Sequence, residues 1–98
     1  MMYPGFTGAR PAVSIVSVVT SASGAAFTAF AAKRCKELDL VNTSGVAIEY
    51  LRDGVGTAFP VPTGSGRMII GLTDASQVSV RRVDQSATQV TVNGEAIA

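Results

Sequence analysis

The sequence predicts a single all-β domain built as an antiparallel sandwich or barrel. Short segments rich in β-branched residues alternate apolar and polar side chains, and Gly, Pro, Asn and Ser separate them roughly every 8–12 residues. At most one segment fits a helix, whereas parallel βαβ units would need several. A length of 98 residues fits one domain. We therefore expect about seven or eight short strands.

Charged residues are scarce in this chain. They make up 15% of the sequence, against about 25% in a typical domain, while apolar residues make up 47%. Low charge in a short chain suggests a surface covered by a partner; the alternative is a monomer with a polar, uncharged exterior. The net charge is +1, and the densest basic spots are Lys33-Arg34 and Arg81-Arg82. Nucleic-acid binding needs a more concentrated basic face, so we expect no nucleic-acid partner.

The segment Met1–Pro11 is expected to form an extended arm ahead of a sandwich domain over residues 12–98. Its density of Gly and Pro prevents regular structure. Tyr3 and Phe6 are aromatic anchors that would attach such an arm to a neighbouring surface, so both are candidate interface residues. The alternative is a frayed terminus.

Residues 11–32 carry no charge and are long enough to cross a membrane. Ser, Thr, Gly and Pro interrupt the run, so we expect no membrane span. A secretory signal peptide is the alternative, with Ala12–Val19 as its apolar stretch. We interpret the segment instead as two strands with a turn between them.

The first of these strands is predicted over Val13–Thr20, which is rich in β-branched residues. The turn follows at Ser21–Gly24. The second strand is predicted over Ala25–Ala32, although its alanines also fit a helix capped by Ser23. We favour the strand because strands flank it.

A β-hairpin is predicted around Asn42–Gly45. Apolar and polar residues alternate on both sides of this turn, over Cys35–Val41 and Val46–Leu51. Asn and Gly tolerate positive φ, which tight hairpin turns require. The two runs are therefore expected to pair with each other.

The remainder of the chain predicts further strands separated by turns. Thr57–Val61 is expected to lie at a sheet edge, because Pro60 lacks an N–H for a ladder. The other predictions are a turn at Arg52–Gly56, a buried strand with a possible Gly bulge at Arg67–Leu72, strands at Gln77–Val83 and Thr88–Asn93, and a turn at Asn93-Gly94.

The residues that most catalytic and metal sites need are missing. The sequence has no His and one Cys, which removes Ser-His-Asp and Cys-His catalysis and zinc sites built from His or Cys. Glu37 and Asp39 share one strand face, as a catalytic pair would, but so do the carboxylates of a solvated face. We expect no enzyme activity, no catalytic residue, no metal and no cofactor.

Two further groups are candidates for a role. Cys35 is expected to be a small buried side chain; the alternative is a thiol activated by the neighbouring Lys33, Arg34 and Lys36. Arg81 and Asp84 are candidates for a salt bridge between subunits. Arg82 is expected to be a solvated edge residue that contributes little.

Four segments from Cys35 onward carry a resemblance to a known family: C-K-E-L-D-L-V-N-T-S-G (Cys35–Gly45), I-E-Y-L-R-D-G-V-G (Ile48–Gly56), the P-x-P-T-G loop (Pro60–Gly64) and V-R-R-V-D-Q-S-A-T-Q-V-T-V (Val80–Val92). In this part, about two thirds of the chain, the sequence resembles the head decoration, or cement, proteins of tailed bacteriophages. The resemblance implies a jelly-roll-like sandwich.

The resemblance also implies a function in a virus particle. A decoration protein is made in the host cytoplasm and binds the outer surface of the capsid, where it bridges capsomers. Its partners would be the major capsid protein and copies of itself, as a dimer or trimer; no membrane partner is expected. The alternative is a receptor- or carbohydrate-binding module of a tail fibre or baseplate. Such a module would present aromatic rings on loops, for which Tyr50 and Phe59 are the candidates.

Overall fold

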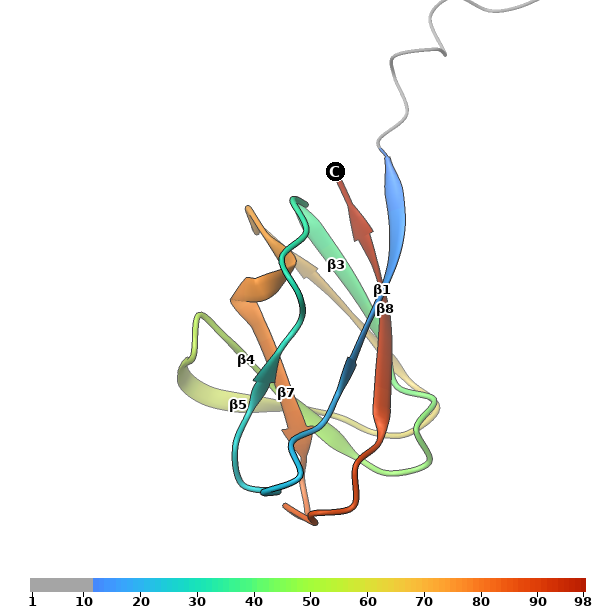
Figure 1. Cartoon of the computed structure of the whole chain (residues 1–98). Coiled ribbons are helices and arrows are strands. Elements are labelled where there is room, and N and C mark those ends of the chain that lie inside the picture. Colours follow the sequence, from blue (N-terminus) through green and yellow to red (C-terminus); the bar gives the residue numbers. More distant parts are fainter. Residues whose placement is uncertain (1–11) are drawn as a thin grey trace, which may run out of the picture.

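The computed structural model describes residues 12–98, which form two four-stranded antiparallel sheets packed on each other (Figure 1). Sheet I contains, in spatial order, β1 (Val13–Val19), β8 (Thr91–Ile97), β3 (Glu37–Val41) and β6 (Gly66–Ile70). Sheet II contains β2 (Thr28–Ala29), β7 (Val78–Arg82), β4 (Ile48–Arg52) and β5 (Val55–Val61). A 3-10 turn over Ala75–Gln77 precedes β7. The predicted all-β sandwich is confirmed; the predicted arm, Met1–Pro11, lies outside the described residues.

The strand order is that of a jelly roll. β1 pairs with β8, β2 with β7, β3 with β6 and β4 with β5, as if one long hairpin had been folded over. Rolling that hairpin up places β3 beside β8 and β4 beside β7, and both pairs are present. Eight strands in two packed sheets joined in this way form the jelly-roll architecture. The fold that the resemblance implied is therefore the fold of the chain.

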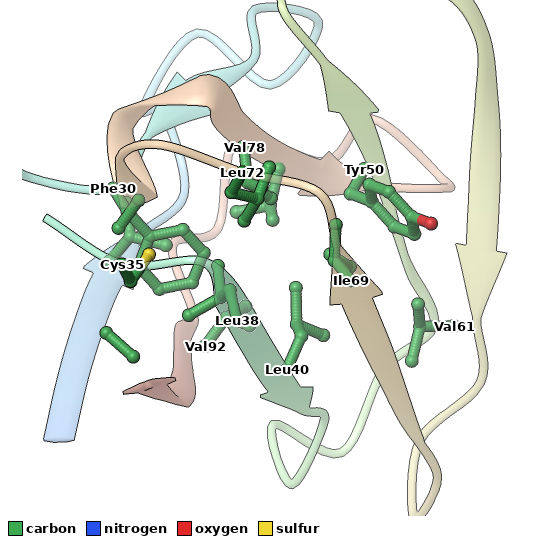
Figure 2. Close-up of a cluster of buried hydrophobic side chains, with 14 of the residues drawn as sticks. Phe30, Cys35, Leu38, Leu40, Tyr50, Val61, Ile69, Leu72, Val78 and Val92 are labelled. Atoms are coloured by element: carbon green, nitrogen blue, oxygen red, sulfur yellow. The ribbon is translucent and has the colours of Figure 1, made fainter. Parts of the chain in front are cut away.

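The inner faces of the two sheets form one apolar core (Figure 2). Its largest side chains, among them Phe30, Leu38, Leu40 and Ile69, are at most 1% exposed. Cys35 lies in the same core, and burial raises the pKa of its thiol. A thiol that resists ionisation is a poor nucleophile. The prediction that Cys35 is a buried apolar residue is confirmed.

The predicted hairpin at Asn42–Gly45 is wrong, because the strands on its two sides belong to different sheets. Asn42 is fully buried, and its Nδ2 donates to the carbonyl oxygens of Val46 at 2.7 Å and Val61 at 2.8 Å. Its Oδ1 accepts from the backbone N of Ser44 at 3.1 Å and from the Ser44 hydroxyl at 2.6 Å. These bonds hold an Asx-type turn that carries the chain from sheet I to sheet II.

A two-residue hairpin instead joins β4 to β5 at Asp53-Gly54. Both residues have positive φ, 57° and 67°, and Arg52 pairs with Val55 across the turn. Positive φ at both central positions defines a type I′ turn, for which Asp-Gly is a preferred sequence. β5 is the edge strand of sheet II, as predicted for Thr57–Val61.

Three other predicted elements differ from the structure. The strand predicted as buried at Arg67–Leu72 is the edge strand β6, whose Met68 and Ile70 are 64% and 60% exposed. The predicted turn at Asn93-Gly94 is wrong, since both residues lie inside β8; a Cβ on Gly94 would meet the Asp39 carbonyl oxygen at 3.0 Å. The uncharged segment contains two strands with a turn between them, as predicted, but the second, predicted over Ala25–Ala32, is the two-residue β2. Within residues 12–98 no helix could span a membrane.

Candidate interaction surfaces

The outer face of sheet I exposes apolar side chains along both of its edge strands. On β1, Val13, Ile15 and Val19 are 53%, 75% and 48% exposed, and on β6 Met68 and Ile70 also point outward. Strand residues alternate between the two faces, so these side chains share one face. The outer face of a sandwich is ordinarily polar. Two apolar strips on one outer face therefore make this face the candidate contact surface.

Three carboxylates separate these strips, and we call them the acidic patch: Glu37 and Asp39 on β3, and Glu95 on β8. Asp39 lies directly opposite Glu95 in the ladder. Like charges in opposite positions of a sheet destabilise it. One carboxylate oxygen of Asp39, Oδ1, is buried without a hydrogen-bond partner. Within residues 12–98 no Lys or Arg forms an ion pair with these three carboxylates, so the acidic patch is a negative region between two apolar strips.

The pKa of Glu37 is raised, first because a proton on Glu37 allows a hydrogen bond to Asp39, then by partial burial and the charge of Asp39. A raised pKa in the folded chain means that ionisation is harder there than in the unfolded chain. The contribution of Glu37 to stability is then fully present below its unfolded pKa, near 4.5, and is lost as pH rises through the folded pKa.

Glu37→Gln is therefore expected to raise the melting temperature at pH 7, because Gln stays neutral and can still donate to Asp39. The advantage over wild type should shrink as pH falls toward 4, where Glu37 of the wild type becomes protonated. Thermal unfolding followed by circular dichroism between pH 4 and pH 8 measures this difference. Glu95→Gln is the matched control: an identical profile for both variants would assign the effect to the net charge of the face, not to the Glu37–Asp39 contact.

Arg81, a predicted interface residue, is held on the outer face of sheet II by its own chain. Its Nε lies 2.6 Å from Glu49 Oε2, and its Nη1 donates to the Ala25 carbonyl at 2.8 Å. The guanidinium also lies over the ring of Phe27, 4.4 Å from the ring centre. These contacts attach the loop that precedes β2 to strand β7. An intersubunit role for Arg81 stays a prediction.

Asp84, the other predicted interface residue, pairs with Arg82 and not with Arg81. Arg82 Nε donates to Asp84 Oδ1 at 2.9 Å, and Nη2 donates to Oδ2 at 2.8 Å. This bidentate contact is the main reason why the pKa of Asp84 is lowered. Arg82 Nη1 also reaches the Thr88 carbonyl at 3.0 Å, and the side chain is only 11% exposed. The prediction that Arg82 is a solvated edge residue is wrong, and the structure does not bring Arg81 and Asp84 together.

The candidate aromatic residues lack the open ring faces that a stacked ligand needs. Tyr50 is buried, at 8% exposure. Phe59 is exposed, but the Arg67 guanidinium lies 4.0 Å from its ring centre and the Tyr50 ring 5.9 Å away. A shallow hollow of about 570 Å³ on sheet II has Phe27, Asp53 and Gln77 in its lining. Phe27 is the aromatic residue in this lining, and the Arg81 guanidinium covers its ring.

Sequence reasoning did not identify the outer face of sheet I, although the signal was present in Val13–Val19, where both strand faces are apolar. Among residues 12–98, no three His, Cys, Asp or Glu side chains are placed to hold a metal ion. Comparison with protein-family models, curated proteins and solved structures gives no match. Tyr3 and Phe6 lie outside the described residues.

Proposed function

We propose that this chain is a non-enzymatic structural protein of a phage head, a decoration or cement protein that binds the outer capsid surface and stabilises contacts between capsomers. The observation that carries the proposal is the outer face of sheet I, where two exposed apolar strips flank the acidic patch. The resemblance of Cys35–Gly45 and Val80–Val92 to decoration proteins supplies the kind of assembly. The site of action is then the virion, after synthesis in the host cytoplasm.

The chemistry of this face suits a protein partner, the major capsid protein. Burial of Val13, Ile15, Met68 and Ile70 would contribute roughly 25 cal/mol per Å² of apolar surface removed from water, and the part that exceeds the entropy cost of association would appear as affinity. The acidic patch would select a capsid surface that offers Lys or Arg between apolar groups, because an unmatched charge at an interface costs binding energy. Each such contact is small, and many copies on one shell add through multivalency.

Co-sedimentation with undecorated phage heads tests the proposal. Wild-type protein is expected to pellet with the heads, and the double variant Met68→Ser/Ile70→Ser to bind at least about tenfold more weakly. Both side chains are more than half exposed, so the fold should tolerate the change. Val55→Ser is the matched control, since Val55 is 71% exposed but belongs to sheet II.

Two outcomes would overturn the proposal. Wild-type protein that does not pellet with heads but binds host cells or glycans would instead support the receptor- or carbohydrate-binding module, with the hollow on sheet II as its site. If Val55→Ser lost head binding and Met68→Ser/Ile70→Ser did not, the capsid contact would lie on sheet II, and the proposed contact through sheet I would be wrong.

A further inference from the structure

The two sheets have four edge strands, and three of them carry devices that oppose pairing with another chain. β2 is only two residues long. β5 contains Pro60, and its register with β4 shifts between Tyr50 and Arg52. On β6, the Arg52 guanidinium donates to the Ile70 carbonyl at 2.6 Å. β1 has no such device: its seven residues include no Pro, no Gly and no charge.

Within residues 12–98, the open side of β1 presents backbone groups without a partner. Ala98 N donates to the Ala12 carbonyl at 2.8 Å, and Thr20 N donates to the Val90 carbonyl at 2.9 Å, so the hydrogen-bonded pairs with β8 fall on even-numbered residues of β1. The odd-numbered residues therefore turn their N–H and C=O groups away from β8. These residues are Val13, Ile15, Ser17 and Val19, and none of them bonds to another described segment.

We propose that this edge is an intermolecular pairing site and that its occupant is β1 of a second copy, antiparallel about a two-fold axis at Val16. The pairing would place Val13 opposite the partner's Val19 and Ile15 opposite the partner's Ser17. Every outward-pointing backbone group of the odd-numbered residues then has a partner. The inference rests on the proposed function and deepens it, because it names the contact between copies.

The charge distribution favours a second copy at the edge over a second copy on the face. Two sheet I faces packed on each other would bring two acidic patches together without a compensating cation. Edge pairing separates the Glu95 residues of the two copies by three strand spacings, about 14 Å, which exceeds the Debye length of about 8 Å at physiological salt. The paired β1 strands themselves carry no charge. The outer face of sheet I stays free for another partner.

The edge alone would make a weak dimer. A seven-residue strand is about 23 Å long, and pairing along it buries less than the roughly 1,000 Å² that stable interfaces need. We therefore expect pairing at high protein concentration or on a surface that holds copies close together, where effective concentration rises.

Disulfide trapping tests the register. The proposed pairing places Ile15 opposite the partner's Ser17, so an equimolar mixture of Ile15→Cys and Ser17→Cys should cross-link under mild oxidation. In a dimer of either variant alone, the two cysteines occupy diagonal positions of the paired strands, about 7–8 Å apart. This separation lies outside the usual range for a disulfide. The yield of the disulfide-linked mixed dimer, identified by its mass, is expected to be at least about tenfold higher than the yield of either homodimer. It should exceed by the same factor the yield of mixed dimer from Ile15→Cys combined with Met68→Cys. Equal yields of cross-linked dimer in all mixtures would overturn the register. Wild-type protein under the same oxidation measures any cross-linking through Cys35.

A proline placed on the open edge tests the pairing without engineered cysteines. The N–H of Ser17 points away from β8, so Ser17→Pro keeps the ladder with β8 and blocks a second β1. Analytical ultracentrifugation up to millimolar concentration should show association at least about tenfold weaker than wild type, with the melting temperature nearly unchanged. Met68→Pro makes the same change on the open edge of β6 and should leave association unchanged.

The outcomes separate this inference from the proposed function. If wild-type protein stays monomeric at millimolar concentration and no cysteine pair is trapped on heads, the edge inference fails even though the protein pellets with heads. If β1 pairs in solution but the protein does not pellet with heads, the proposed function fails and the edge inference stands.

Discussion

Asn42→Ala is expected to lower the free energy of unfolding by about 3 kcal/mol. The wild-type side chain is fully buried and makes four hydrogen bonds, to the carbonyls of Val46 and Val61 and to the backbone N and hydroxyl of Ser44. Alanine would remove all of these bonds. The Val61 carbonyl lies in a buried region, and leaving such a group unpaired costs about 1–3 kcal/mol.

Urea denaturation followed by circular dichroism measures this loss, with Asn93→Ala as the matched control. Asn93 lies on the exposed outer face of β8, and its replacement should change stability by no more than about 0.5 kcal/mol. A loss below about 1 kcal/mol for Asn42→Ala would mean that the crossing between the sheets is held by other contacts. Asn42→Asp should cost at least as much as the alanine change, because it loses both donors and buries a carboxylate.

The sequence predicted the strands far better than their partners. Alternation in Val46–Leu51 and Gln77–Val83 indicates a strand with one buried face. β7 lies within the second range, and β4 overlaps the first and extends one residue beyond it, to Arg52. A turn signal reports only that the chain reverses. At Asn42–Gly45 the reversal carries the chain to the other sheet, because the side chain of Asn42, which follows β3, bonds to the carbonyls of Val46 and Val61, and Val61 belongs to β5 of sheet II. At Asp53-Gly54 the positive φ angles match the twist of a tight hairpin, so pairing is local.

The candidate contact surface was harder to predict, because it depends on how strands from distant parts of the sequence meet. Glu37 and Asp39 are neighbours in sequence, but Glu95 joins them only because β8 pairs with β3. The pairing of Asp84 depends in the same way on strand geometry: Arg82 and Asp84 come together where β7 ends, while Arg81 points to the other side and meets Glu49. Residue type identified charged groups in each case, and the strand register decided which of them interact.

Gly24→Ala is expected to lower the free energy of unfolding by about 3 kcal/mol or more, for two separable reasons. Gly24 has φ +77°, a conformation that costs an L-residue about 1–2 kcal/mol. A Cβ at this position would also lie 2.2 Å from the backbone oxygen of Gln85, so one of two loops would have to move. These loops, Ser21–Phe27 and Val83–Val90, lie at the same end of the sandwich (Figure 1).

Gly45→Ala separates the two reasons. Gly45 has φ +89°, but nothing lies within 4 Å of an added Cβ, so this variant should lose only the conformational part, about 1–2 kcal/mol. Urea denaturation of both variants gives the difference, which isolates the contact between Gly24 and Gln85. Equal losses would show that the loops separate freely. A larger loss for Gly24→Ala would show that this contact ties the connection that leaves β1 to the connection that enters β8, and so supports β1, the strand of the proposed pairing edge.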